Sequence, residues 1–351
     1  MVIVATGQHR DMLGQMLEAF DLRPDVDLGV GRDGQNLNSL AARALASLGD
    51  LIHDARPSAV VVQGDTTTAM IGALAAFHAR VPVAHLEAGL RTTDRHNPFP
   101  EETNRRIVGR LADRHLAPTV RARDALIREG VSAEEILVTG NTVIDALLHV
   151  TGLPPRPTGH ARLDETLESD GPLVLVTTHR RESQGAPMRG VVEALAAVAI
   201  ARPTVRFVLP VHPNPAVKHV VESALSRLPN VCLTEPLDYR AFTRVLARCD
   251  IVLTDSGGVQ EEAPSLGKPV LVLRDNTERP EGVDAGCARL VGTRPETIRT
   301  WLERLLDDPA AYSAMAGVHN PYGDGRAAAR TVDALEELLG LNAVVPTPFG
   351  S

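Results

Sequence analysis

The chain is poor in cysteine: it has three, Cys232, Cys249 and Cys287, among 351 residues. None belongs to a C-x-x-C pair, so the sequence encodes neither a zinc ribbon nor a disulfide framework. We expect them to be reduced core residues of a cytoplasmic protein. No apolar stretch approaches the ~20 residues of a transmembrane helix, and the apolar run at the start is too short for a signal peptide. The sequence therefore predicts no contact with a membrane.

Positive charge is also scarce, since 36 Lys and Arg stand against 44 Asp and Glu and give a net charge of -8. This balance excludes the strongly basic surface of a nucleic-acid-binding protein. Only Lys218 and Lys268 are lysines, so nearly all positive charge is arginine, whose planar guanidinium suits phosphate and carboxylate partners. The length exceeds the ~250–300 residues that one hydrophobic core usually serves, which predicts two domains.

Several cofactor motifs are missing as well. No G-x-G-x-x-G directly follows the first apolar run, and no G-x-x-x-x-G-K-[ST] occurs anywhere. These absences argue against a usual dinucleotide-binding fold and against a P-loop NTPase. The chain also lacks H-E-x-x-H and any cluster of Cys and His with metal-ligand spacing. We therefore expect neither NAD nor a metal as cofactor.

Short runs of apolar and β-branched residues alternate with amphipathic helical patterns along the whole chain. The runs are continuous, which favours parallel strands covered on both faces. The predicted strands are 2–6, 58–63, 81–86, 114–117, 136–139, 172–178, 206–211, 251–255, 269–273 and 288–291. The predicted helices are 36–55, 66–79, 101–112, 120–129, 142–150, 187–201, 216–227, 239–248, 259–266, 295–306 and 326–340. This alternation predicts an α/β fold with doubly wound parallel sheets.

One segment, residues 151–171, is rich in Pro and Gly and carries no strand pattern. We therefore expect a linker at 156–171. It separates an N-terminal Rossmann-like domain at 1–155 from a C-terminal one at 172–335, with a tail at 336–351. Ligands of such sheets bind at the carboxyl ends of the strands, so polar residues at those ends are the functional candidates.

In the first half, three acidic residues occupy such positions. Asp65 follows one predicted strand, Glu87 follows the next, and Glu101 opens a helix. Each has an ordinary explanation: Asp65 or a neighbouring Thr caps a helix, Glu87 forms a buried ion pair with Arg91, and Glu101 complements a helix dipole. Together they place three carboxylates at one rim, which is typical of a general acid–base site.

In the second half, His179 and Arg180 follow one predicted strand and His212 follows the next. A histidine beside arginines at a strand end suits a developing anion. A lone histidine is usually an ordinary polar residue, but two at equivalent strand ends favour function.

The segment Ser256-Gly257-Gly258 joins a strand to a helix, and its backbone N–H groups are not screened by side chains. This pattern is typical of phosphate binding, although a simple glycine-rich turn is the alternative. Glu262 lies one turn into the same helix, where it can accept hydrogen bonds from ribose hydroxyls. Arg279 belongs to a polar loop after the following strand.

These segments together resemble the non-hydrolysing UDP-N-acetylglucosamine 2-epimerases. The motifs that carry the resemblance are GQHRDM, QGDTTTA, HLEAGLRT, PFPEETNR, TGNTVIDAL, THRRES, HPNP, LTDSGGVQEEAPSLGKPV and NTERPEG, in unbroken order over residues 7–282. The resemblance implies two Rossmann-like domains of the glycosyltransferase-B type, which face each other across a cleft that holds the nucleotide sugar. It also implies a homodimer that uses neither NAD nor metal, and a place in polysaccharide biosynthesis.

The reaction that the resemblance implies is an anti elimination of UDP from UDP-N-acetylglucosamine (UDP-GlcNAc). UDP then adds back to the 2-acetamidoglucal intermediate to give UDP-N-acetylmannosamine (UDP-ManNAc). By resemblance the acid–base carboxylates are Asp65, Glu87 and Glu101, in an order that the sequence leaves open, and His179 stabilises or protonates the departing diphosphate. The substrate-binding residues implied are Phe242 for the uracil region, Ser256, Gly257 and Gly258 for the phosphates, Glu262 for the ribose, and Arg279 for the sugar or phosphate. Positions matching a pocket for a second UDP-GlcNAc, as activator, are Gln8, Arg180 and His212.

The chain departs from the family pattern at its start, which corresponds to the family's second strand, so the first domain lacks the usual first strand and helix. We expect a missing start, because every other motif is intact. Leu237 stands where the family often has Gln. The alternative functions are a UDP-sugar transferase of the same fold, which needs no carboxylate cluster in its first domain, and an inactive UDP-sugar-binding partner subunit.

Overall fold

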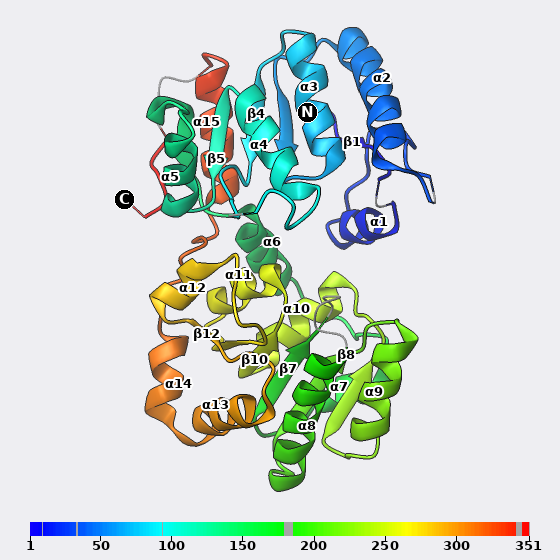
Figure 1. Cartoon of the computed structure of the whole chain (residues 1–351), viewed down its shortest axis with the longest axis vertical. Helices are drawn as coiled ribbons and strands as arrows, with labels where there is room; N and C mark the ends of the chain where they lie inside the picture. The colour runs from blue at the N-terminus through cyan, green and yellow to red at the C-terminus, as the bar shows by residue number, and fades with distance from the viewer. Residues whose placement is uncertain (9, 33, 93, 179–184, 342–345, 351) are drawn as a thin grey trace. The chain divides into compact units, whose positions relative to one another are not determined.

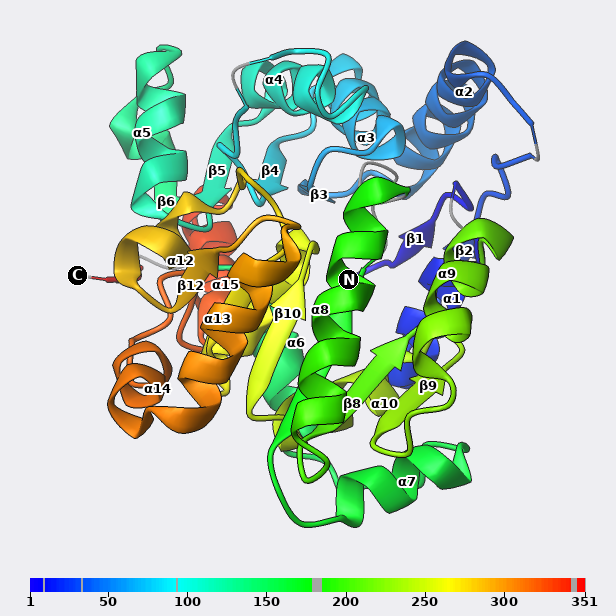
Figure 2. The ribbon, with the colours of Figure 1, turned by 60° about the horizontal axis from the view of Figure 1, so that its bottom comes forward.

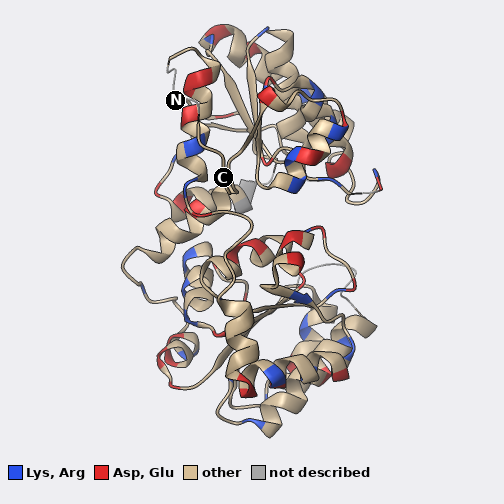
Figure 3. Ribbon diagram, turned by 90° about the vertical axis from the view of Figure 1, so that its left-hand side faces the viewer, with Lys and Arg blue, Asp and Glu red and all other residues tan. Residues whose placement is uncertain are grey.

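The computed structural model describes residues 1–350 except 9, 33, 93, 179–184 and 342–345, and leaves the side chains of 10–12 undescribed. The chain forms two compact units (Figure 1). Unit 1 comprises Met1–Asp145 and Gly323–Ser351, and unit 2 comprises Ala146–Tyr322. Acidic and basic residues are interspersed along the helices of both units (Figure 3). None of the described helices is long and apolar enough to cross a membrane.

Unit 1 is built on a parallel sheet of four strands in the order β3-β4-β5-β6. These strands are β3 (Val60–Gln63), β4 (Val83–Leu86), β5 (Arg114–Ala117) and β6 (Ile136–Val138). A separate two-stranded parallel sheet pairs β1 (Val4–Ala5) with β2 (Val26–Asp27). The strands predicted in this half are confirmed. The sequence missed β2, because two residues form no recognisable apolar run.

Helices cover both faces of the four-stranded sheet. The helices of unit 1 are α1 (Arg10–Ala19), α2 (Leu37–Ala55), α3 (Thr67–His78), α4 (Glu101–Leu111), α5 (Val120–Arg128), the first part of α6 (Thr142–Thr151) and α15 (Ala327–Leu338), with a 3-10 turn η1 (Ala133–Glu135). Leu40 of α2 and Val108 of α4 share one core with Val62 and Val83. Helix α15 covers the other face (Figure 1), where its Ala334 packs with Ala84 and Leu116. Burial on both faces explains why these strands are continuously apolar.

Unit 2 is a parallel six-stranded sheet in the order β12-β11-β10-β7-β8-β9. Its strands are β7 (Leu173–Thr177), β8 (Arg206–Pro210), β9 (Val231–Thr234), β10 (Ile251–Thr254), β11 (Val270–Val272) and β12 (Ala288–Leu290). Its helices after α6 are α7 (Ala161–Glu168), α8 (Ala186–Ala201), α9 (Pro215–Leu225), α10 (Tyr239–Arg248), α11 (Gly257–Ser265), α12 (Pro280–Ala285), α13 (Pro295–Asp307) and α14 (Pro309–Ala316). Helices α8 and α13 lie side by side over one face (Figure 2).

The strand order of unit 2 defines where a ligand binds. From β7 the chain proceeds to β8 and β9 on one side, and β10 then returns to the other side of β7. The carboxyl ends of β7 and β10 therefore form the topological switch point, where open α/β sheets bind their ligands.

The two units divide the chain differently from the domain bounds expected from the sequence. Unit 1 ends at Asp145 instead of 155, and its last segment begins at Gly323, within the expected second domain. Backbone N–H groups at the start of α15 donate to the Asp145 carboxylate, and Arg114 pairs with Glu337 at 2.6 Å. The expected linker at 156–171 contains α7, whose leucines are buried in the core of unit 2.

Candidate functional site

In unit 1, the ends of β3 and β4 bring two of the predicted carboxylates together. After β3 the chain turns at Gly64, which has a φ of 69° and donates its N–H to Leu86 O of β4 at 3.0 Å. A Cβ at this glycine would lie 3.4 Å from Oε2 of Glu87. The Glu87 carboxylate therefore faces the turn that carries Asp65, and a side chain larger than hydrogen would crowd it.

Asp65 is held by α4. Arg105 donates to Asp65 Oδ2 at 2.5 Å, and Asn104 Nδ2 donates to the Asp65 carbonyl at 2.9 Å. The Asp65 side chain remains 26% exposed, whereas that of Arg105 is only 10% exposed. A buried guanidinium thus fixes a carboxylate that is still accessible. The sequence alone indicates neither partner, because both lie about 40 residues away in the chain.

Glu87 adopts a φ of 59°, in the left-handed region that non-glycine residues rarely occupy. Asn141 Nδ2 donates to its Oε1 at 3.0 Å. Strained positions of this kind cluster at functional sites and persist only where the surrounding structure enforces them. The alternative interpretation, a Glu87–Arg91 ion pair, is wrong, because Arg91 forms a two-pronged pair with Glu129 at 2.8 Å.

Glu101 begins α4 and is half-buried. Its side chain makes no hydrogen bond or ion pair with any residue that the structure describes. It lies three and four residues before Asn104 and Arg105, so all three share a face of α4. Since that face bonds to Asp65, Glu101 belongs to the same region of unit 1.

The adjacent Glu102 has a structural role. It is fully buried, pairs with Arg105 and Arg106, and accepts a hydrogen bond from Thr92 N.

In unit 2, the predicted phosphate cradle follows β10. Ser256 caps α11, its Oγ accepting from Val259 N at 3.5 Å, and its own N–H donates to Thr254 Oγ1 at 2.9 Å. Gly257 and Gly258 open the helix, and a Cβ at Gly258 would meet nothing within 4 Å. Because these residues lie at the switch point, the open N-terminus of α11 suits an anionic ligand.

The predicted ribose acceptor, Glu262, is 5% exposed. Tyr239 on α10 donates its hydroxyl to Glu262 Oε1 at 3.0 Å. Burial raises the pKa of the Glu262 carboxyl to about 7. Phe242, on the same helix as Tyr239, packs partly buried against the hydrophobic core. The hydroxyl of Tyr239, which no pattern in the sequence indicates, holds the carboxylate.

Arg279, at the start of α12, forms an ion pair with the buried Glu261. Leu237 is partly buried and packs against the hydrophobic core. Gln8 lies in unit 1, where its Oε1 accepts from Thr68 N at 3.2 Å. His212 lies in unit 2, where its Nδ1 accepts from Asn214 N at 3.1 Å. His179 and Arg180 lie outside the described residues.

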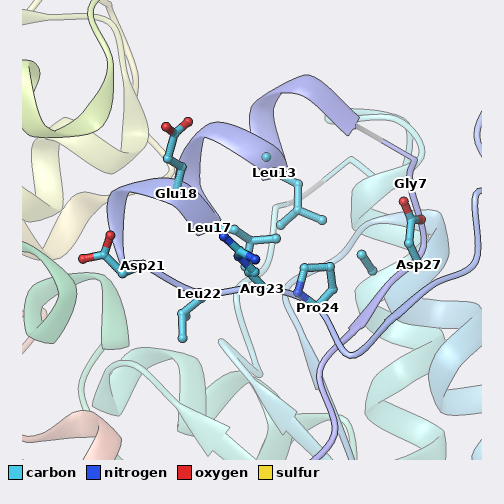
Figure 4. A pocket seen from close by; sticks show the side chains of 11 residues that line it. Gly7, Leu13, Leu17, Glu18, Asp21, Leu22, Arg23, Pro24 and Asp27 are labelled. Atoms are coloured by element: carbon cyan, nitrogen blue, oxygen red, sulfur yellow. The ribbon is translucent and has the colours of Figure 1, made fainter.

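Unit 1 also has a cavity of about 600 Å³ between α1 and the β1–β2 sheet (Figure 4). Its described lining combines apolar side chains such as Leu13, Leu17 and Leu22 with the acidic Glu18 and Asp21, and includes none of the predicted catalytic residues. The carboxylates at β3 and β4, and not this cavity, therefore form the candidate site of unit 1. Within the part of the chain that the structure describes, no group of three or more His, Cys, Asp and Glu is placed to hold a metal ion.

Comparison with known proteins gives a consistent result. The sequence profile described as UDP-N-acetylglucosamine 2-epimerase matches residues 1–336. A probable UDP-N-acetylglucosamine 2-epimerase of Ralstonia nicotianae is 48% identical over 338 residues, which cover 95% of this chain and 90% of the relative. The UDP-N-acetylglucosamine 2-epimerase of Escherichia coli K12 is 46% identical with the same coverage.

Solved structures agree in fold. The crystal structure of a putative UDP-N-acetylglucosamine 2-epimerase from Listeria monocytogenes has a TM-score of 0.91 at 42% identity, covering 100% of this chain and 91% of that one. The UDP-GlcNAc 2-epimerase of Neisseria meningitidis, bound to UDP-GlcNAc, has a TM-score of 0.83 at 40% identity, covering 94% and 90%. The expected α/β architecture of the glycosyltransferase-B type is confirmed.

Proposed function

The chain belongs to the UDP-N-acetylglucosamine 2-epimerase family, and from that premise we propose how its residues interconvert UDP-GlcNAc and UDP-ManNAc. The enzyme is an isomerase, like the relatives that bear that name. The observation that carries the proposal is the gathering of Asp65, Glu87 and the Glu101 face of α4 around one turn.

The reaction inverts C2 of the sugar through elimination and re-addition. Anti elimination breaks the C2–H and C1–O bonds and releases UDP, leaving 2-acetamidoglucal. UDP then adds back at C1, while C2 takes a proton on the opposite face. This chemistry needs a base, an acid on the other face, and a cradle for the departing diphosphate.

The three carboxylates of unit 1 supply the acid and the base. Asp65 is fixed by Arg105 and Glu87 by Asn141, so both are oriented before the substrate arrives. Glu101 has no such partner among the described residues and is free to reorient. Positioned acid–base groups contribute ~10²–10⁴-fold each to the rate.

Unit 2 supplies the nucleotide site. The residues Ser256, Gly257 and Gly258 hold the diphosphate at the start of α11, Glu262 accepts from the ribose, and Phe242 borders the uracil. Arg279, oriented by Glu261, contacts the sugar or phosphate. His179 stabilises or protonates the leaving group. Support comes from the relatives, because Staphylococcus aureus MnaA has been solved with UDP and the Neisseria enzyme with UDP-GlcNAc.

Two further features are proposed from the family resemblance. The enzyme acts as a homodimer, and a second UDP-GlcNAc activates it through Gln8, Arg180 and His212. Dependence of the initial rate on UDP-GlcNAc, with UDP-ManNAc as the starting substrate, tests the activation.

The function is tested by incubating the chain with UDP-GlcNAc in deuterated water and following C2 by NMR. We expect deuterium at C2 and UDP-ManNAc as product, without any acceptor. Free ManNAc with UDP would indicate a hydrolysing enzyme, and turnover only with an added acceptor would indicate a transferase. Binding of UDP without exchange would overturn the proposal in favour of a binding subunit.

A further inference from the structure

His85 is a buried histidine in the middle of β4 that reaches the end of the neighbouring strand. Its side chain is 1% exposed, and its Nε2 hydrogen-bonds to the carbonyl oxygen of Gly64 at 2.8 Å. Gly64 immediately precedes Asp65. The imidazole therefore acts on the peptide group that leads into a predicted catalytic carboxylate.

The protonation state of this histidine follows from its surroundings. Burial, together with the charges of Arg91 and Arg105, lowers the pKa of His85 to about 4, although the hydrogen bond to Gly64 acts in the opposite direction. The neighbouring His115 is buried as well, with its pKa also lowered to about 4 by burial. At neutral pH the ring of His85 is thus uncharged, and because a carbonyl oxygen only accepts, Nε2 must carry the hydrogen.

The turn that receives this hydrogen bond is fixed at several points. Gly64 N donates to Leu86 O at 3.0 Å, the Asp65 carbonyl accepts from Asn104, and the Asp65 carboxylate accepts from Arg105. The Gly64 carbonyl is held by the hydrogen bond from His85. Because glycine has wide backbone freedom, the orientation of its peptide group depends on that partner.

We propose that His85 is a positioning residue: by donating Nε2–H to the Gly64 carbonyl, it fixes the peptide before Asp65 and so aims that carboxylate for proton transfer. The proposal rests on the proposed function of Asp65. A displacement of ~1 Å in a reacting group costs on the order of 10²-fold in rate, so the loss of one such bond has a measurable effect.

The chain contains a matched control in His115. It is the register partner of His85 on β5, it is likewise 1% exposed, and its pKa is lowered by the same cause. Neither Nδ1 atom has a hydrogen-bond partner among the described residues. The structure gives His115 no bond to the Gly64 turn, so its replacement reports only the cost of losing a buried imidazole.

The test compares His85→Leu, His85→Gln and His115→Leu. The carboxamide nitrogen of Gln takes the place of Nε2 and restores the donor, whereas Leu cannot. We expect His85→Leu to lower kcat by about 10–100-fold, with KM and UDP affinity unchanged, and deuterium incorporation at C2 to fall in parallel. His85→Gln recovers most of kcat, and His115→Leu stays near the wild type.

A second readout does not depend on turnover. Amide hydrogen exchange of the Gly64–Thr66 turn should accelerate in His85→Leu but not in His85→Gln or His115→Leu. Should His85→Leu fail to fold, His85→Asn replaces it, because its shorter carboxamide falls short of the Gly64 carbonyl.

Two results would overturn the proposal: equal kcat in His85→Leu and His115→Leu, or no rescue by Gln in a folded variant. A wild type that neither epimerises UDP-GlcNAc nor incorporates deuterium at C2 would refute the proposed function. Faster amide exchange of the Gly64–Thr66 turn in His85→Leu would then still show that the hydrogen bond orders the turn.

Discussion

In unit 1 two of the candidate carboxylates, Asp65 and Glu87, are held in place by other side chains, whereas in unit 2 the candidate phosphate cradle is formed by backbone N–H groups at a helix start. Asp65 depends on Arg105 and Glu87 on Asn141, and Glu87 has a strained backbone besides. Ser256 instead caps its own helix. Proton transfer requires groups that change charge, while holding a diphosphate requires fixed dipoles, so the proposed function assigns proton transfer to unit 1 and diphosphate binding to unit 2.

The buried titratable groups of the two units differ in the same way. In unit 1, burial lowers the pKa of His85 and His115 to about 4, and in unit 2 it raises the pKa of Glu262 to about 7. Burial favours the neutral form in every case. The effect of pH on stability is opposite. The contribution of the two histidines to the free energy of unfolding is lost as the pH falls, whereas that of Glu262 is lost as the pH rises.

The largest effect is expected from the carboxylates of unit 1. Asp65→Asn, Glu87→Gln and Glu101→Gln each remove a charge that proton transfer needs, and we expect kcat to fall by ~10²–10⁴-fold. UDP affinity, measured by calorimetry, should stay close to that of the wild type, since its proposed ligands lie in unit 2.

Glu336→Gln is the control, because this acidic residue of α15 is half-buried and takes no part in the proposed chemistry. The assignment of proton transfer to unit 1 and of UDP binding to unit 2 would be disproved if all three variants turned over normally, or if they lost UDP binding as strongly as activity.

The next effect is the acid sensitivity of unit 1. The folded pKa values of His85 and His115 lie below the ordinary value of 6.5, so the unfolded chain binds more protons between pH 6.5 and 4. The two uncharged imidazoles contribute their full stabilisation above pH 6.5 and lose it as the pH falls towards 4. The free energy of unfolding then falls by about 3 kcal/mol at most for each histidine. Urea unfolding followed by peptide-resolved hydrogen exchange measures this for unit 1.

His115→Leu should flatten part of this pH dependence and leave that of unit 2 unchanged. The same urea midpoint for unit 1 at pH 5 and pH 7 would contradict the assignment of two neutral imidazoles.

Much of the fold was predictable, because parallel strands buried on both faces form continuous apolar runs such as LVLVT at β7. The sequence failed where that signal is short or where partners are distant. The four residues of β9 and the two of β2 passed unnoticed, and the Leu163–Leu167 spacing of α7 was lost in a Pro- and Gly-rich segment.

Positions at strand ends identified the candidate carboxylates, but not what holds them. Arg105 and Asn141 are separated from Asp65 and Glu87 by dozens of residues, so only the folded chain brings them together. The local expectation that Arg91 pairs with Glu87 failed for the same reason, because Glu129 of the neighbouring helix end takes that arginine.

A smaller effect is expected in unit 2 from Glu262→Gln. Replacing the charged acceptor with a neutral one should weaken UDP binding about tenfold, because a hydrogen bond to a charged group contributes ~1.5–3 kcal/mol and one to a neutral group only ~0.5–1.5 kcal/mol. The folded pKa lies above the ordinary 4.5, so Glu262 stabilises the fold below that value and ceases to do so as the pH rises through 7. The variant should therefore be more stable than the wild type at pH 8, by about 1–3 kcal/mol.

Trp301, the only tryptophan, lies on α13 and reports the unfolding of unit 2 by fluorescence, so it measures this difference in stability.

UDP affinity should rise from pH 6 to pH 8 more steeply in the wild type than in Glu262→Gln. The variant is the control for the titration of UDP itself. Equal slopes would mean that Glu262 does not bind the ribose in its ionised form.

The smallest effect compares two helix caps. Thr119 caps α5 in unit 1 with a hydrogen bond of 3.1 Å to Ala122 N, while the Ser256 cap is longer, at 3.5 Å. Thr119→Ala should cost ~1 kcal/mol of stability and leave UDP affinity unchanged. Ser256→Ala should cost less stability but weaken UDP binding severalfold, because a loosely bonded hydroxyl at the start of α11 is available to a phosphate oxygen. If both variants lost stability alone, Ser256 would be an ordinary cap, and the cradle would consist of backbone N–H groups only.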